Sequence, residues 1–142
     1  MNRKTALKNL LATHAEPVRA LLPDYLHHLV PFKVERFGPL TKYTLGQLPD
    51  GRWAMLHRVI RPDSGAPHCH PCQMESHRIK GSYWERLYRN GTVQDVLREE
   101  GSSHVIEADC IHLLTALPQG EVWTLVLSGP VVRKWRHYPG LV

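Results

Sequence analysis

Two patterns of hydrophobic residues divide the sequence near residue 31. Before that point, leucine and valine recur at steps of three and four residues, which is the period of an amphipathic helix. Two short helices are predicted by these positions: Leu7, Leu10, Leu11, Val18, Leu21, Leu22, Leu26 and Leu29. Pro17 suits the first turn of the second helix, whereas Pro23 either kinks that helix or ends it.

From about Phe32 onward, short runs of β-branched and aromatic residues alternate with turn sequences. Among these, Pro49-Asp50-Gly51, Asn90-Gly91 and Pro118-Gln119-Gly120 favour tight reversals of the chain. Many short strands without helical patterns between them predict an antiparallel sandwich or barrel. The predicted strands are Lys33–Phe37, Lys42–Leu48, Arg52–Ile60, Ser82–Tyr88, Val93–Arg98, His104–Ile106, Ile111–Ala116, Val122–Leu127 and Val131–His137.

The sequence therefore predicts an all-β protein with one additional helical segment. With 142 residues, of which 42% are hydrophobic, the chain suits a single compact domain. We expect residues 1–31 to form the helical segment and to pack on the outside of a β-barrel domain formed by residues 32–142.

The overall charge excludes little. Lysine and arginine number 18 against 13 acidic residues, which gives a net charge of +5, and no run of five like charges concentrates it.

No apolar stretch approaches the roughly 20 residues of a membrane-spanning helix, and the N-terminus lacks the apolar core of a signal peptide. We therefore expect a cytoplasmic protein without a membrane partner. Three cysteines are too few for a disulfide framework.

The ten histidines are the unusual part of the composition. Six of them fall in the middle of the chain, at positions 57, 68, 70, 77, 104 and 112. Histidine is the commonest metal ligand in proteins and a common general base. This central region is therefore where a functional site is expected.

The spacing of these histidines suggests a metal site. Alternate side chains of an extended chain project to the same side, so His68 and His70 can direct both imidazoles at one point. After a reversal at Pro71, Glu75 can return to that point from a neighbouring strand, and His112 lies at the start of another strand. Three imidazoles, with or without one carboxylate, suit a divalent first-row metal.

The same residues resemble a known superfamily. His68-x-His70-x4-Glu75-x5-Gly81 resembles the first metal-binding motif of the cupins, and Asp109-Cys110-Ile111-His112 resembles the second, which supplies a single histidine. The resemblance, to small bacterial and phage-type single-domain cupins, covers roughly residues 52–137. It implies a jelly-roll barrel with the metal inside, held by His68, His70, His112 and Glu75.

The resemblance also implies a function. We expect a mononuclear metal-dependent enzyme, an oxygenase that acts on a small organic acid or thiol, with Fe(II) as the metal and Zn, Mn or Ni as alternatives. Cupins share a fold rather than a reaction, so a second reading stays open. In that reading the chain is a non-catalytic sensor or accessory protein that binds a metal or a small molecule.

Further residues are candidates for the chemistry of this site. Glu75 could serve as an acid–base group, and His77 as an acid–base group or a substitute metal ligand. Arg58 could hold a substrate carboxylate if it, rather than His57, faces the barrel interior. The spacing of Cys69 and Cys72 leaves a zinc or redox site open.

The partners of the chain are less clear from its residues. The basic tail, residues 133–137, is divided between two strand faces, which favours a solvated exterior over nucleic-acid binding. Exposed edge strands of a small β domain are often covered by a partner, which makes a homodimer an expectation.

Overall fold

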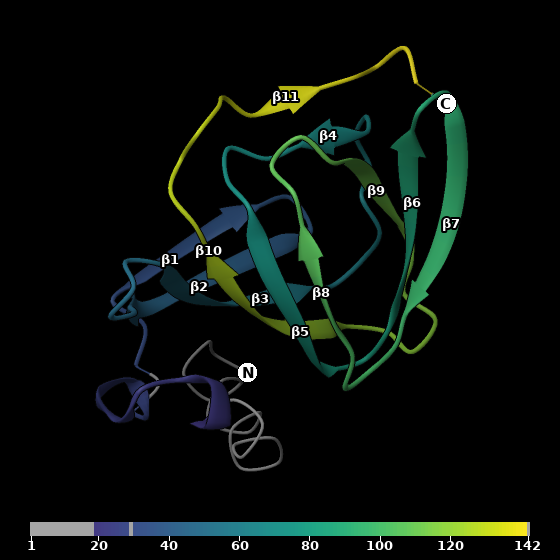
Figure 1. Cartoon of the computed structure of the whole chain (residues 1–142). Coiled ribbons are helices and arrows are strands. Elements are labelled where there is room, and N and C mark those ends of the chain that lie inside the picture. The colour runs from purple at the N-terminus through teal and green to yellow at the C-terminus, as the bar shows by residue number, and fades with distance from the viewer. Residues whose placement is uncertain (1–18, 29, 142) are drawn as a thin grey trace.

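The computed structural model describes residues 19–28 and 30–141, which form two antiparallel sheets (Figure 1). Sheet A has the strand order β1-β2-β3-β10-β5-β8, and sheet B has the order β11-β4-β9-β6-β7. The all-β prediction is confirmed. The strands are β1 (Lys33–Phe37), β2 (Leu40–Gln47), β3 (Trp53–Val59), β4 (His68–Cys69), β5 (Met74–Lys80), β6 (Tyr83–Arg89), β7 (Thr92–Arg98), β8 (Ser103–Ile106), β9 (Ile111–Ala116), β10 (Val122–Ser128) and β11 (Arg136–His137).

The predicted strand boundaries agree with the structure to within two residues except in three places. Strands β4 and β5 were not among the predicted runs, although β4 pairs with β9 and β5 pairs with both β10 and β8. The predicted strand Val131–His137 is reduced to β11. The reason is that the backbone N–H groups of Val132 and Arg133 both donate to the carbonyl oxygen of Pro71, which is a loop contact rather than a strand ladder.

The N-terminal helical prediction is not supported by the residues that can be compared, which contain little helix. The first predicted helix lies outside the described residues. Of the second, residues 19–21 are helical and a 3-10 turn, η1 (Asp24–Leu26), follows. Pro23 separates them because it lacks an N–H and has an extended backbone, with ψ of 153°. A helix with the length and apolarity that crossing a bilayer requires is absent from the described residues.

Sheet A carries a different core on each of its faces. The outer face packs against Leu22 and Leu26, and Gly46 makes room there, because a Cβ at that position would overlap the Leu26 side chain. The inner face carries a second cluster that includes Met55 and Val126. Arg78 reaches from this inner face to the Tyr83 hydroxyl of sheet B, so the inner face is the one between the sheets.

Strand alternation assigns further residues to these two faces. On β3, His57 lies on the same face as Met55, which is the inner face. Arg58 lies on the same face as Leu56, which is the outer face. The polar residues that the sequence singles out are therefore divided between two separate environments.

Candidate metal centre

Three histidines meet on the inner side of sheet B. His68 on β4 lies directly opposite His112 on β9, and His70 follows two residues later on the side that His68 faces. Their ring centroids are 4.8 Å apart for His68 and His112, 5.1 Å for His68 and His70, and 4.7 Å for His70 and His112. One nitrogen from each ring lies within 4.8 Å of the other two, so a single ion could contact all three.

Hydrogen bonds orient His112 within this group. Its Nε2 lies 3.4 Å from the Nε2 of His70, and its Nδ1 lies 2.5 Å from a carboxylate oxygen of Glu85. Strand register explains the second contact: Leu87 lies opposite His112 on β6, so Glu85 is the diagonal neighbour on the same face. The other carboxylate oxygen of Glu85 accepts from Nε of Arg98 at 2.9 Å.

Sequence reasoning missed Glu85. The available signal was the alternation of β6, in which Glu85 shares a face with Tyr83 and Leu87, two residues expected in a core. A glutamate at such a position is unusual because a buried charge needs a partner. The identity of that partner depends on the pairing of β6 with β9, which is not local in the sequence.

Burial keeps two of the three imidazoles, His68 and His70, neutral. Burial lowers the pKa of His70 to about 2 and that of His68 to about 4. Burial alone would raise the pKa of Glu85, but hydrogen bonds from His112 and Arg98 lower it to about 2. At neutral pH, His68 and His70 are therefore neutral, the form that binds metals, and Glu85 is an ionised carboxylate.

Other polar side chains lie buried near the three histidines. Burial lowers the pKa of His57 to about 3 and that of His104 to about 4. Nε2 of His57 and both ring nitrogens of His104 are buried without a hydrogen-bond partner, although Nε2 of His104 lies 3.7 Å from Glu85. Arg78 donates to oxygens of Ser76 and Ser102 and to the Tyr83 hydroxyl, all of which are uncharged acceptors.

Glu75 and His77 are not brought together with the three histidines. They lie on the outer face of β5, because side chains alternate along the strand and Met74 and Ser76 lie on its inner face. There Nε2 of His77 contacts Glu75 at 2.8 Å, Nδ1 of His77 contacts the Ser103 hydroxyl at 2.6 Å, and Arg52 donates to Glu75 at 2.8 Å. This geometry does not support Glu75 as a ligand or His77 as an acid–base group of the histidine site.

Arg58 is placed away from the histidines as well. Its guanidinium pairs with Glu121 at 2.8 Å and lies over the Trp123 ring, whose centroid is 5.7 Å away. Trp123 belongs to the outer core. On β3 it is His57 that lies on the inner face. The geometry therefore does not agree with Arg58 holding a substrate carboxylate in the barrel interior.

The C-terminal segment passes over the histidines. Strand β11 pairs with β4, so that His137 lies opposite His68. The Trp135 ring stacks on His68, with centroids 4.8 Å apart and an angle of 12°, and meets His70 edge to face at 5.2 Å. An aromatic side chain that sequence reasoning assigned to a solvated tail therefore forms one wall of the histidine site.

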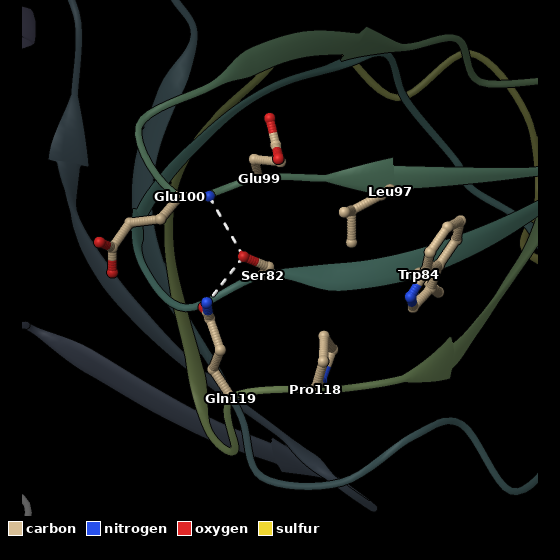
Figure 2. Close-up of a pocket in the computed structure, with 7 residues that line it drawn as sticks. All are labelled: Ser82, Trp84, Leu97, Glu99, Glu100, Pro118 and Gln119. Atoms are coloured by element: carbon tan, nitrogen blue, oxygen red, sulfur yellow. Dashed lines mark hydrogen bonds between the residues drawn. The ribbon is translucent and has the colours of Figure 1, made fainter.

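A surface hollow of about 530 Å³ lies elsewhere on the molecule (Figure 2). Ser82 and Gln119 are hydrogen-bonded at 3.0 Å in its wall, and Trp84 and Leu97 supply its apolar part. None of the residues that line it belongs to the histidine group. The hollow is therefore separate from the candidate metal centre.

The three cysteines are free, and Cys69 is fully buried. Within the described residues, the group with metal-binding geometry consists of the three histidines and includes no cysteine. A zinc site shared by Cys69 and Cys72 is therefore not supported by this arrangement.

The donor set fits a divalent first-row metal ion. Imidazole suits iron, zinc, copper and nickel, and three protein ligands leave coordination positions for a substrate. A carboxylate behind one ligand is a common feature of metal-binding histidines. His68, His70 and His112 are the residues that would hold the ion.

Comparisons with known proteins define the fold. No protein-family model matches the sequence, and no curated protein matches it either. Similar solved structures are cupin-fold proteins. The likeness confirms the cupin fold that the sequence motifs predicted; the phage-type subgroup stays a prediction.

Three of these structures illustrate the likeness. A chain from a study of the DMSP lyases RdDddP and RnDddQII is 20% identical, with a TM-score of 0.55, over 70% of this chain and 52% of that one. Hydroxypropylphosphonic acid epoxidase from S. wedmorenis, in complex with fosfomycin, is 12% identical, with a TM-score of 0.57, over 76% and 57%. Lactobacillus farciminis oxalate decarboxylase is 10% identical, with a TM-score of 0.56, over 74% and 33%.

The chain spans about half of the length of the lyase-study and epoxidase structures, and a third of the decarboxylase. The epoxidase has also been solved with Fe(II). At these identities the comparison establishes the fold, and the activities belong to the other proteins.

Proposed function

We propose that this protein is a mononuclear metal-dependent enzyme that binds Fe(II) through His68, His70 and His112. The supporting observation is the convergence of three imidazoles, one of them oriented by a buried carboxylate. The fold is shared with a chain from the DMSP-lyase study, an epoxidase and a decarboxylase, and the epoxidase has been solved with Fe(II). Oxygenase chemistry on a small organic acid or thiol is the reaction that we propose.

The chain's own residues would contribute binding, orientation and shielding. Fe(II) when bound would supply Lewis acidity and redox chemistry. Trp135 stacks on His68 and limits access of water from that side, which strengthens electrostatic interactions within the site. His57 and His104 are neutral and have ring nitrogens without a hydrogen-bond partner. Each can therefore donate a hydrogen bond to a substrate or accept one from it.

The charges near the site favour an acidic substrate. Arg78 is only 2% exposed, and its hydrogen-bond acceptors among the described residues are all uncharged. Arg98 is neutralised by Glu85. Among the described residues, Arg78 therefore lies between the sheets without a charged hydrogen-bond partner, before a metal ion adds its own charge, and this supports a substrate that carries a carboxylate.

Metal analysis followed by an oxygen assay tests the proposal. The chain would be purified without added metal, reconstituted separately with Fe(II), Zn(II), Mn(II) and Ni(II), and assayed for oxygen consumption with small organic acids and thiols. We expect one metal per chain and consumption with Fe(II) only. Absence of stoichiometric metal after reconstitution would refute the metal site, and a loaded protein that is inactive throughout the panel would refute the oxygenase.

A non-catalytic metal-binding role is the second candidate. It is favoured by Trp135, whose ring covers one side of His68, and by the hollow of Figure 2, whose lining includes none of the three histidines. This reading predicts a metal without an exchangeable water. Water-proton relaxation measured on the Mn(II)-loaded protein separates the two, because a catalytic site enhances relaxation through rapid exchange at an open position.

A further inference from the structure

We propose that Glu85 is the positioning residue of the metal centre: its carboxylate fixes the proton of His112 on Nδ1 and thereby directs an unprotonated Nε2 at the metal. This inference rests on the proposed function, since it assigns a role relative to the ion that the three histidines would bind. Glu85 itself would not contact the metal.

The first step of the argument concerns the hydrogen bond between Glu85 and His112. An ionised carboxylate can only accept hydrogen bonds, so at 2.5 Å the Nδ1 of His112 must be the donor. In a neutral imidazole the other nitrogen then carries a lone pair. Nε2 of His112 is therefore the ligand atom, and it is the atom that faces His70.

The second step concerns the fixed position of Glu85. Its side chain is 1% exposed, and its second oxygen accepts a hydrogen bond from Arg98 at 2.9 Å. Glu85 and Arg98 lie on neighbouring strands, with Glu85 opposite Val96 and Tyr83 opposite Arg98. A carboxylate that is held by a cation from one side and by the sheet from the other has little freedom, so it can define the orientation of the ring that donates to it.

The third step is the contact between His70 and His112. Their Nε2 atoms are 3.4 Å apart, which is close to the limit for a hydrogen bond. If Glu85 holds the proton of His112 on Nδ1, only His70 can donate across this gap without a metal. A bound cation removes the need for that proton, since both lone pairs then point at the ion.

Metal affinity tests this role, with Co(II) as the probe because it binds imidazole sites and has a visible spectrum. Glu85→Gln keeps the size of the side chain but removes its charge, and its amide can turn to donate to Nδ1, which permits the other tautomer. We expect Co(II) affinity to fall about 10- to 100-fold, the usual range for the loss of such a partner. The matched control is Glu75→Gln, which changes the glutamate bonded to His77 and should leave the affinity within about twofold.

A second measurement, on the metal-free protein, separates positioning from a general effect on folding. Two-bond ¹H–¹⁵N spectra report which ring nitrogen of each histidine carries the proton. We expect His112 to be protonated on Nδ1 alone in the wild type and to show a mixture in Glu85→Gln, with native dispersion of the other signals.

The outcomes distinguish this proposal from the proposed function. Unchanged Co(II) affinity in Glu85→Gln, or a wild-type His112 protonated on Nε2, would overturn the positioning role. If the wild type binds no metal but His112 carries its proton on Nδ1, the metal-dependent function fails while the tautomer assignment survives. Weaker affinity together with a lost tautomer preference would support the role of Glu85.

Discussion

Two pairs of histidine and glutamate, one carried by sheet B between the two sheets and one on the outer face of sheet A, show how position determines what the same chemistry can do. Between the sheets, His112 contacts Glu85 at 2.5 Å; on the outer face of the sheet, His77 contacts Glu75 at 2.8 Å. The Glu85 side chain is 1% exposed, whereas that of Glu75 is 38% exposed. Similar hydrogen bonds therefore lie in very different dielectric surroundings.

The difference is visible in how each carboxylate is held. Burial opposes ionisation of Glu85, yet hydrogen bonds from His112 and Arg98 lower its pKa to about 2. Burial also opposes ionisation of Glu75, and Arg52 with His77 lowers its pKa. Water can replace the partners of Glu75 but not those of Glu85, so the inner pair should control both stability and the metal site while the outer pair controls neither.

The largest contrast should be in the free energy of unfolding when the carboxylate of Glu85 or that of Glu75 is removed. Glu85→Ala leaves Arg98 and His112 without their buried acceptor and should lower the free energy of unfolding by about 3–5 kcal/mol. Glu75→Ala breaks a partly exposed network and should cost less than about 1 kcal/mol. Urea unfolding at pH 7 measures both, and equal losses would show that the two environments do not differ as described.

The second-largest contrast should be in metal affinity, between variants of His112 and of His77. His112→Ala removes one of three ligands and should weaken Co(II) binding at least about 100-fold, since each ligand carries a large share of the binding free energy. His77→Ala, on the outer face, should change the affinity less than about twofold. Isothermal titration of both variants decides this, and comparable losses from His77→Ala would place that residue in the metal site.

The fold could be predicted from the sequence more completely than the residues that contact the three histidines. Turn sequences and strand alternation predicted most strands, because those signals are local. Strand β5 was missed since its inner phase carries Ser76 and Arg78, which erases the apolar alternation of a half-buried strand. The second predicted helix is short in the described residues because it ends before Pro23, one of the two effects expected of that proline, and Leu22 and Leu26 pack against sheet A.

The site was partly predictable for the same physical reason. His68 and His70 share a side by strand alternation, and the structure brings His112 to them through the pairing of β4 with β9. For Glu75, the loop that separates β4 from β5 means that its phase cannot be counted from His70. Glu85 depended on the register between β6 and β9, which the sequence does not show.

The pH dependence of stability should reflect the inner histidines. Burial lowers the pKa of His57 to about 3 and of His104 to about 4 from 6.5, so the unfolded chain takes up protons below pH 6.5 that the folded chain does not. Stability of the metal-free protein should therefore fall as the pH drops from 6.5 toward 4, by about 1.4 kcal/mol per pH unit for each such histidine.

His104→Gln isolates one of these contributions. Urea unfolding at pH 6.5, 5.5 and 4.5 should show a slope smaller than that of the wild type by about 1.4 kcal/mol per pH unit. The contribution of Glu85 falls in a lower window, between 4.5 and about 2, because its pKa is lowered in the folded state. An unchanged slope in His104→Gln would mean that His104 is not held neutral by burial.

The smallest contrast lies between two serines on neighbouring strands of sheet A. Ser103 on β8 contacts His77 at the outer face and is exposed, so Ser103→Ala should change the free energy of unfolding by less than about 0.5 kcal/mol. Ser76 on β5 is 2% exposed and accepts from Arg78, so Ser76→Ala leaves a buried guanidinium donor unsatisfied and should cost about 1–3 kcal/mol. The substitution is identical in the two variants, so urea unfolding under one set of conditions compares only their surroundings. A larger loss from Ser103→Ala would mean that the outer network, rather than the buried one, stabilises this sheet.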